Sequence, residues 1–313
     1  MGEAISTHAP RFLMVRGGAI GDFIVTLPVL QALRTQWPLA TIHIWGYPHI
    51  AQLAVCGGLA ESVLSLDRAD MSRFFVPSPD FTEEQIAAVR SYDIILNYLH
   101  DPVGQVRSNL LLAGARQVLS GSPIIKRGHA IPFLLEPLQA LAIFETDGVP
   151  ELDVSGEARA EARRALRDSG FNGRPFAVHP GSGSPLKQWP LEHFLEILRR
   201  IQKAGREVVV LLGEADRDEG HVLLNQMPDL PRFENLPLQS VAALLSECSG
   251  YLGNDSGITH LAAAVGIPVT ALFGPSNVEI WKPRGRAPVQ VLQASNQQMD
   301  QIRIDEVWAA LHA

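Results

Sequence analysis

The sequence predicts an α/β protein of two domains in series, each a parallel β-sheet covered by helices. Along the whole chain, short apolar runs typical of buried strands alternate with longer amphipathic stretches typical of helices. A length of 313 residues exceeds what a single core of ordinary size requires. The polar stretch Glu145–Gly156, which contains glycine and proline, interrupts the alternation, which then starts again. We therefore expect domains at residues 1–150 and 151–313, with the terminal helix able to pack back on the first.

The composition is that of a globular protein with an acidic balance. Hydrophobic residues make up 46% of the chain and charged residues 19%, with a formal net charge of −7. Residues 1–150 hold 10 basic and 13 acidic side chains, which leaves 16 and 20 for the remainder, so neither half is a basic nucleic-acid-binding module. Cys56 and Cys248 have no metal-ligand spacing, and we expect both to be small buried hydrophobes in a reducing compartment.

The sequence shows neither a signal-peptide pattern nor a membrane-spanning run. The opening MGEAISTHAP lacks the charged-then-apolar order of a signal peptide, and no run reaches the ~18 apolar residues that span a bilayer. We expect a cytoplasmic protein whose contact with a membrane, at the cytoplasmic face of the inner membrane, is at most peripheral.

The first half opens with a strand, a glycine-rich loop, a helix and a second strand. The strands are expected at Phe12–Val15 and Thr41–Trp45, and the helix at Phe23–Gln36, with Pro28 in its first turns, where a missing N–H is tolerated. The alternation continues with helices near Pro48–Val55, Glu83–Arg90, Arg107–Gly114 and Pro132–Phe144, strands at Val63–Leu66 and Ile94–Leu99, and loops at Asp67–Asp80 and Pro123–Gly128. The last loop carries Lys126-Arg127, which is either a solvated surface feature or part of a site for an anionic acceptor.

The glycine-rich loop disfavours a nicotinamide-dependent oxidoreductase. Gly18 and Gly21 match the last two glycines of a dinucleotide-binding fingerprint, but Arg16 occupies the place of the first. His43-Ile44-Trp45-Gly46 stands where a ribose-binding acid would follow the second strand. The glycines instead allow the backbone to approach a ligand or another domain closely.

Asp22 begins the helix after this loop, and two interpretations are open. As an acid at a helix N-terminus it would stabilise the helix dipole by about 0.3–1 kcal/mol. As a carboxylate at the C-terminal end of a strand, facing a cleft, it would serve as a general base.

The second half repeats the alternation. Strands are expected at Pro175–His179, Glu207–Leu212 and Val289–Leu292, and helices at Glu157–Ser169, Leu191–Ala204, Ala215–Gln226, Leu238–Ser246 and Glu306–Leu311, the last capped by Asp305. The loop 180–190 offers small hydroxyl and glycine positions followed by Lys187, which suits a diphosphate. Glu214 follows the next strand, where a carboxylate can accept hydrogen bonds from a ribose diol. Each feature alone is more often a surface feature, but both follow strand ends.

The segment Tyr251–Pro275 reads as strand, turn, helix and strand. Its turn combines Asp255, Ser256 and Gly257, and His260 follows one helical turn later. A helix start at the end of a parallel strand presents unpaired N–H groups that suit a phosphate. The alternative is that Asp255 or Ser256 merely caps the helix and that His260 points into solvent or into a core where its hydrogen bonds are satisfied.

Four blocks resemble those of the ADP-heptose:lipopolysaccharide heptosyltransferases, glycosyltransferase family 9. They are FLMVRGGAIGDFIVTLPVLQAL, FAVHPGSGSPLKQWPLEHFLEIL, LLGEAD and YLGNDSGITHLAAAVGIPVTALFGPSNVEIW, in the family's order. The resemblance implies a GT-B fold, in which two Rossmann-like domains face each other across a cleft, with the acceptor on the first and the nucleotide sugar on the second. It also implies inverting transfer without a metal ion or other cofactor.

The resemblance further assigns roles to individual residues. Asp22 matches the base that deprotonates the acceptor hydroxyl, and Lys187 matches the lysine that neutralises the donor diphosphate. The remaining donor-side matches are Ser182, Ser184, Glu214, Asp255, Ser256, Gly257 and His260, and the acceptor-side residues are Arg16, Gly18 and Gly21.

The implied partners are ADP-heptose and a glycolipid or glycan acceptor, such as the lipopolysaccharide core, and no nucleic acid. Two other functions stay open from the sequence: transfer of a different nucleotide-activated sugar, and a catalytically silent nucleotide-sugar-binding protein. We also expect the domains to close around the donor, with Glu145–Gly156 as one hinge.

Overall fold

The structure, a computed structural model, describes residues 9–144 and 148–312 and contains two compact units. The first unit is built from three segments: the one that ends at Gly18, then Thr26–Arg127, then Ile131–Gly148. The second is built from 149 onward together with two short segments, Ala19–Val25 and Gly128–Ala130. The segment that carries Asp22 therefore packs with the second unit although it follows the first strand of the chain.

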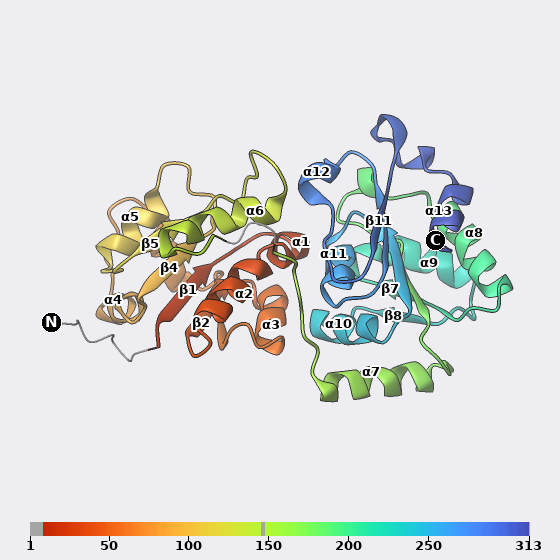
Figure 1. Ribbon diagram of the computed structural model, residues 1–313, viewed down its shortest axis with the longest axis horizontal. Helices are drawn as coiled ribbons and strands as arrows, with labels where there is room; N and C mark the ends of the chain where they lie inside the picture. The colour runs from red at the N-terminus through yellow and green to blue at the C-terminus, as the bar shows by residue number, and fades with distance from the viewer. Residues whose placement is uncertain (1–8, 145–147, 313) are drawn as a thin grey trace. The chain divides into compact units, whose positions relative to one another are not determined.

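The first unit is a parallel five-stranded sheet with helices around it (Figure 1). The strand order is β3-β2-β1-β4-β5. Its strands are β1 (Arg11–Val15), β2 (Thr41–Gly46), β3 (Ser62–Ser65), β4 (Ile94–Asn97) and β5 (Val118–Ser120). Leu13 and Val15 of β1 and Ile95 of β4 pack in one buried cluster with Trp45 and Phe74, so the central strands hold the core.

The helices of this unit begin with α2 rather than with one long helix from Phe23. The chain forms α1 (Ile20–Ile24), breaks at Val25-Thr26 and starts again, with Pro28 in the first turn of the second helix, as expected. The remaining helical elements are α2 (Leu27–Gln36), α3 (Pro48–Cys56), α4 (Glu83–Arg90), α5 (Gln105–Leu112) and α6 (Ala130–Leu135), with 3₁₀ turns at Ala69–Phe75 and Glu136–Leu141.

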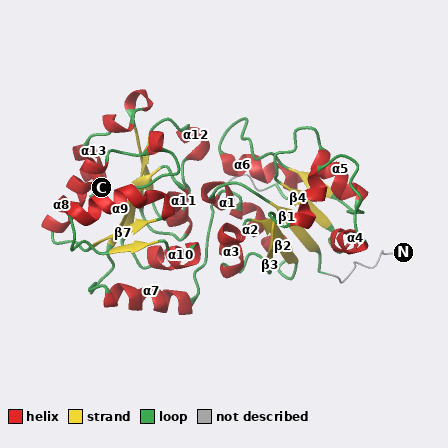
Figure 2. Cartoon of the chain, turned by 180° about the vertical axis from the view of Figure 1, so that it is seen from behind, coloured by secondary structure: helices red, strands yellow, loops and turns green. Residues whose placement is uncertain are grey.

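The second unit is a parallel six-stranded sheet with helices on both faces (Figure 2). The strand order is β11-β10-β9-β6-β7-β8. Its strands are β6 (Phe176–His179), β7 (Val208–Leu212), β8 (Arg232–Glu234), β9 (Gly250–Asn254), β10 (Val269–Phe273) and β11 (Val289–Gln293). Every residue of the four inner strands is buried, because helices cover both faces of the sheet.

Helices of the second unit follow the strands in the expected alternation. They are α7 (Gly156–Asp168), α8 (Leu191–Lys203), α9 (Arg217–Gln226), α10 (Leu238–Ser246), α11 (Gly257–Ala264), α12 (Val278–Trp281) and α13 (Ile304–Ala310), with 3₁₀ turns at Pro185–Lys187, Glu214–Asp216, Ser295–Gln297 and Met299–Gln301. Val307 of the terminal helix lies in the same buried cluster as Phe194 and Leu198 of α8. The terminal helix therefore completes the core of the second unit. The sequence analysis had also allowed this helix to pack on the first domain.

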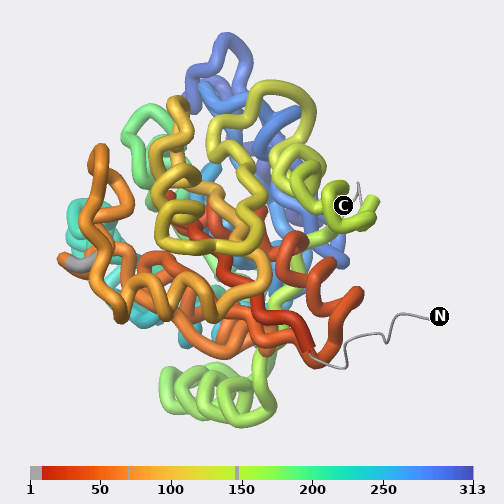
Figure 3. The backbone as a smooth tube through the Cα atoms, turned by 90° about the vertical axis from the view of Figure 1, so that its left-hand side faces the viewer, coloured from red at the N-terminus to blue at the C-terminus, as the bar shows by residue number. Residues whose placement is uncertain are grey.

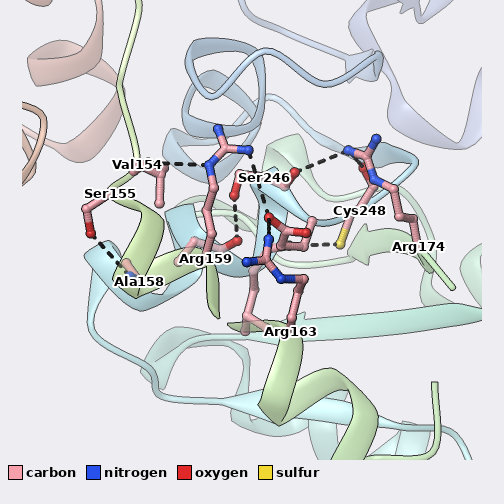
Figure 4. A network of polar contacts seen from close by, with 11 residues as sticks. Val154, Ser155, Ala158, Arg159, Arg163, Arg174, Ser246 and Cys248 are labelled. Carbon is pink, nitrogen blue, oxygen red and sulfur yellow. Dashed lines mark hydrogen bonds and ion pairs between the residues drawn. The ribbon is translucent and has the colours of Figure 1, made fainter. Parts of the chain in front are cut away.

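The chain enters the second unit through an extended stretch and then forms α7, the light-green coil at the bottom of Figure 3. Ser155 caps this helix by accepting the N–H of Ala158 at 3.2 Å. Glu247, just after α10, forms ion pairs with two arginines of α7: Arg163 at 3.0 Å and Arg159 at 3.8 Å (Figure 4). These ion pairs hold α7 on α10.

A third arginine secures the turn that follows α10. Arg174 Nη2 donates to the carbonyl oxygens of Ser246 at 3.2 Å and Cys248 at 2.7 Å (Figure 4). Burial raises the pKa of the Cys248 thiol to about 12, so this cysteine is an inert core residue, as expected. The expectation for Cys56 is wrong, because that side chain is exposed at the end of α3.

Several boundaries differ from the sequence analysis. It did not anticipate β5 or β8, each of only three residues. The terminal helix starts at Ile304 with Arg303 at its N-cap, so Asp305 lies inside the first turn and does not cap it. Of the expected linker, residues 145–147 lie outside the described residues. In the described part of the chain, no helix combines the length and apolarity that a membrane crossing requires.

Candidate functional site

The strand order of the second sheet creates a crevice at its centre. β6 and β9 are neighbours, yet the chain proceeds outward from β6 through β7 and β8, and in the opposite direction from β9 through β10 and β11. The loops after β6 and β9 therefore diverge, and open parallel sheets bind ligands at such a point. All donor-binding residues predicted from the sequence follow the ends of β6, β7 or β9.

Asn254, the last residue of β9, fixes the loop that follows β6. Its fully buried side chain donates from Nδ2 to the carbonyl oxygens of Pro180 at 2.6 Å and Gly181 at 3.3 Å, and its Oδ1 accepts the N–H of Trp189 at 3.0 Å. Both ends of the loop 180–189 are thus bound to one side chain. The sequence analysis missed this residue, because its role depends on partners more than 60 positions away.

An ion pair joins the loop after β6 to the turn after β9. Lys187 Nζ lies 2.7 Å from Asp255 Oδ2. Ser182 Oγ also donates to the main-chain oxygen of Asp255 at 3.1 Å. The Asp255 carboxylate is nearly buried, and among the described residues its Oδ2 has no partner with good hydrogen-bond geometry, so Lys187 is its electrostatic counterpart. A ligand that draws the lysine away leaves a buried carboxylate in need of another donor.

The start of α11 presents free backbone donors to the same crevice. Ser256 occupies the N-cap position, but its hydroxyl lies 3.2 Å from Thr259 Oγ1 and makes no cap bond. Asp255 makes none either, so the simple capping interpretation of these two residues is wrong. The first N–H groups of a helix have no partner within it, and here they face a site that suits an anion.

Asp22 lies on α1, which packs closely on α11. A Cβ placed on Gly257 would lie 2.4 Å from Ile20 Cβ and 3.0 Å from the nitrogen of Gly21, so only glycine permits this approach. Asp22 Oδ2 accepts the N–H of Ala19 at 3.0 Å. Asp22 therefore has the helix-terminal role that the sequence allowed, and it also lines the cavity described next.

Two adjoining cavities occupy the crevice. The larger, about 400 Å³, is the more polar of the two and is called the polar cavity below. It is lined by nine of the predicted site residues: Gly21, Asp22, Ser182, Ser184, Lys187, Asp255, Ser256, Gly257 and His260. The smaller, about 280 Å³, has Glu214 at its wall and is otherwise largely apolar, with Phe233, Leu236, Leu238, Val241 and Ile258. Ser182, Gly183, Ser256 and Gly257 line both. The pair suits a ligand with a charged half and an apolar, planar half.

His260 is a neutral residue in the polar cavity. It is only 4% exposed, and burial lowers its pKa to about 4; Asp255 and Asp22 oppose this shift, whereas His129 and Lys187 add to it. At neutral pH the ring is therefore uncharged and can both donate and accept hydrogen bonds.

Two residues of this region were not anticipated. Trp281, at the end of α12, lines the polar cavity. His129 lies close enough to His260 to influence its pKa, and its Nε2 lies 2.8 Å from the carbonyl oxygen of Lys282. The sequence offered the signal of a histidine directly after the Lys126-Arg127 loop, but nothing that linked it to the donor side.

The predicted acceptor-side residues are not all in one place. Gly21 lines the polar cavity, whereas Arg16 and Gly18 line neither cavity. Arg16 is 2% exposed in the first unit, where its Nε donates to Thr26 Oγ1 at 3.1 Å and its Nη1 to the carbonyl oxygen of Tyr98 at 3.4 Å. These bonds point the guanidinium into the protein.

The basic loop is partly neutralised. Arg127 Nη2 donates to both carboxylate oxygens of Glu136, at 2.9 and 3.0 Å.

Within the described residues, no three His, Cys, Asp or Glu side chains are grouped as a metal ion would require. Lys187 is the cationic side chain at the polar cavity.

Comparisons with known proteins agree on one family. A model of glycosyltransferase family 9 (heptosyltransferase) matches residues 115–309. Lipopolysaccharide heptosyltransferase 2 of Salmonella typhimurium is 30% identical over 145 residues, which is 43% of this chain and 40% of that protein. The aligned stretch thus spans well under half of that relative.

Solved structures show the same fold over nearly the whole chain. A glycosyl transferase family 9 protein from Veillonella parvula has a TM-score of 0.82 at 20% identity, covering 99% of this chain and 98% of its own. The ADP-heptose lps heptosyltransferase II of E. coli has a TM-score of 0.75 at 19% identity, covering 96% and 97%. The expected fold class, α/β of the GT-B type with two Rossmann-like domains, is confirmed.

Proposed function

The chain belongs to glycosyltransferase family 9, and on that premise we propose that it transfers a heptose from ADP-heptose to a hydroxyl of the lipopolysaccharide core or a related glycan, by an inverting and metal-independent reaction. The observation that carries the proposal is the polar cavity of the second unit. There Asp22, Lys187 and the start of α11 surround one space, beside a second cavity of largely apolar character.

The two cavities divide the donor between them. The adenosine occupies the smaller cavity, with its base among the apolar side chains and its ribose near the carboxylate of Glu214. The diphosphate passes the shared wall at Ser182 and Gly257, where backbone N–H groups can donate to it. The heptose lies in the larger cavity, near Asp255 and His260.

Transfer then follows a single displacement. Asp22 takes the proton of the acceptor hydroxyl. At the same time the oxygen of that hydroxyl attacks the anomeric carbon of the heptose from the face opposite to the diphosphate. The new carbon–oxygen bond forms as the bond from that carbon to the phosphate oxygen breaks, so the configuration inverts. General-base assistance of this kind contributes roughly 10²–10⁴ in rate.

The leaving group is ADP, and its growing charge is met by groups already in place. Lys187 exchanges its bond with Asp255 for a phosphate oxygen, and the N-terminus of α11 adds its unpaired N–H groups. Asp255, released from the lysine, is then positioned to accept hydrogen bonds from hydroxyls of the sugar. Donor binding therefore replaces the ion pair between Lys187 and Asp255 with contacts from both side chains to the donor.

Acceptor binding is assigned to the first domain, residues 1–150, and donor binding to residues 151–313 together with the segment that carries Asp22. An acceptor anchored in the inner membrane would require peripheral contact with that membrane. Closure of the domains about the Glu145–Gly156 linker stays a prediction, which scattering profiles with and without ADP can test.

A donor panel tests the proposal. Calorimetric titration with ADP, UDP and GDP should show clear preference for ADP, and the protein should transfer heptose from ADP-heptose to a lipopolysaccharide core truncated before its heptoses. Preference for UDP or GDP would instead indicate a transferase for another sugar nucleotide. Binding of ADP-heptose without transfer to any acceptor of a glycan panel would indicate a silent binding protein.

A further inference from the structure

His179 is the last residue of β6 and lies between the core of the second unit and the smaller cavity. The residue is only 5% exposed, and it lines the cavity together with Leu211, Gly213 and Asp216. In the sheet it is paired with Gly253 of β9, so it stands at the point where the loops diverge.

Hydrogen bonding fixes which nitrogen of this ring carries the proton. His179 Nδ1 lies 2.9 Å from the carbonyl oxygen of Leu211, and a carbonyl oxygen only accepts, so Nδ1 is the donor. Asp216 Oδ2, held at 2.7 Å by the N–H of Gly213, is 3.8 Å from the same nitrogen and favours the same arrangement. A neutral ring with its proton on Nδ1 presents a lone pair at Nε2.

The second ring nitrogen, Nε2, is not engaged by the described part of the protein. Nε2 has no hydrogen-bond partner among the residues that the structure describes, and it is not one of the atoms sealed from solvent. Because the rest of the residue is nearly buried, we infer that this accessible, unpartnered acceptor faces the cavity that His179 lines. Because the rest of the cavity lining is largely apolar, a ligand that lacks a donor at this point leaves the acceptor without a hydrogen bond, which costs affinity.

We propose that His179 Nε2 accepts a hydrogen bond from the nucleoside of the donor, either from a ribose hydroxyl or from the exocyclic amine of the base, and is thereby a specificity-determining residue. This inference rests on the proposed function, since it requires a nucleotide in the smaller cavity. Its role differs from that of Glu214, because a carboxylate accepts from many geometries whereas a ring nitrogen accepts along one direction.

The test uses the full chain and four nucleotides: ADP, 2′-deoxy-ADP, 3′-deoxy-ADP and inosine diphosphate, in which a carbonyl replaces the amine. In His179→Asn the amide nitrogen can still donate to Leu211, but the acceptor at the Nε2 position is lost. We expect this variant to bind ADP about tenfold more weakly and to lose the discrimination that the parent shows against one of the three analogues. His179→Gln places an amide oxygen near the Nε2 position and should recover part of the affinity.

A spectroscopic readout separates this role from a merely structural one. Nitrogen NMR of the parent should show the proton on Nδ1, and the Nε2 resonance should shift when ADP is added. Equal preference ratios in the parent and in His179→Asn, or an Nε2 resonance that ADP leaves unmoved, would overturn the assignment while leaving ADP binding intact. A parent protein that fails to bind ADP would refute the proposed function, and the role of His179 with it.

Discussion

The ammonium group of Lys187 lies 2.7 Å from Oδ2 of Asp255, so the cation of the polar cavity is already engaged before any donor arrives. The lysine comes from the loop after β6 and the aspartate from the turn after β9. A diphosphate must therefore compete with a nearly buried carboxylate for this cation. The carboxylate opposes the binding of an anion, and once released it can accept hydrogen bonds from the hydroxyl groups of a sugar.

This relationship predicts opposite effects on two kinds of ligand. Asp255→Asn should bind ADP at least as tightly as the parent, because Lys187 is released and a like charge is removed. The same variant should lose about tenfold or more in kcat/KM with ADP-heptose, since the hydrogen bonds from sugar hydroxyls to a charged acceptor are lost. Calorimetry with ADP and a transfer assay measure the two effects. Lys187→Met is the control, and it should weaken both ligands; an Asp255→Asn variant that binds ADP much more weakly would contradict this account.

Asp22→Asn tests the general base without removing the helix terminus. Asparagine keeps an oxygen that can accept the N–H of Ala19, so folding should be unaffected. The loss of basicity should lower kcat by about 10²–10⁴, with ADP affinity within twofold of the parent. Asp218→Asn is the matched control, because Asp218 is also an acid in the first turn of a helix but is exposed on α9 and lines neither cavity. Transfer by Asp22→Asn at the parental rate would rule out the assignment.

Gly257→Ala tests the close contact of α1 with α11. The added methyl group would lie 2.4 Å from Ile20 Cβ, so α1 must move and carry Asp22 with it. We expect kcat/KM to fall by about 10²-fold and the free energy of unfolding to fall by about 1–3 kcal/mol. Gly156→Ala, in the first turn of α7, meets nothing within 4 Å, so it should leave kcat/KM unchanged and should not lower the free energy of unfolding. An active Gly257→Ala enzyme would show that the contact is not required.

Much of this arrangement follows from patterns local in the sequence. The alternation of apolar runs with amphipathic stretches predicts the parallel sheets, and the rule that ligands bind at strand ends brings Ser182, Lys187, Glu214 and Asp255 together. The pattern does not indicate with which of the two units a short segment packs. The amphipathic pattern of Phe23–Gln36 runs on across Val25-Thr26, although the helix breaks there and α1 packs with the second unit.

Other omissions have equally physical causes. Asn254 acts through partners at 180, 181 and 189, and a single asparagine at the end of a strand gives no sign of such bonds. The strands β5 and β8 have only three residues each, too few to show a period of two. Arg16 appeared beside a glycine loop where a ligand contact is plausible, yet its guanidinium turns inward to Thr26.

Arg16→Lys tests that inward role. The bond from Arg16 to Thr26 joins the residues on either side of the segment 19–25, which leaves the first unit and returns to it. Lysine cannot reproduce the guanidinium geometry, so we expect the free energy of unfolding to fall by about 1–3 kcal/mol and transfer to weaken through displacement of α1. Thr26→Val should be similar and non-additive with it in a double-mutant cycle. Arg107→Lys, an exposed control, should be neutral; full stability of Arg16→Lys would refute this role.

His260 predicts a loss of stability in mild acid. Burial lowers its pKa from 6.5 to about 4. Well above pH 6.5 neither the folded nor the unfolded state holds the proton, and the histidine contributes nothing to the pH dependence. Between pH 6.5 and 4 the unfolded chain takes up a proton that the folded protein excludes, so the free energy of unfolding falls as pH falls. The effect levels off below pH 4 at on the order of 3 kcal/mol.

Urea unfolding of the parent and of His260→Gln at several pH values between 7.5 and 4.5 measures this contribution. The variant lacks the titrating ring, so its stability should fall less steeply with acidification, and the gap between the two proteins should change steadily below pH 6.5. His221→Gln, at an exposed position on α9, is the control and should follow the parental curve. Parallel curves for the parent and His260→Gln would mean that the ring takes up its proton as readily in the folded protein as in the unfolded chain. In that case the polar cavity would hold a cationic histidine in mild acid.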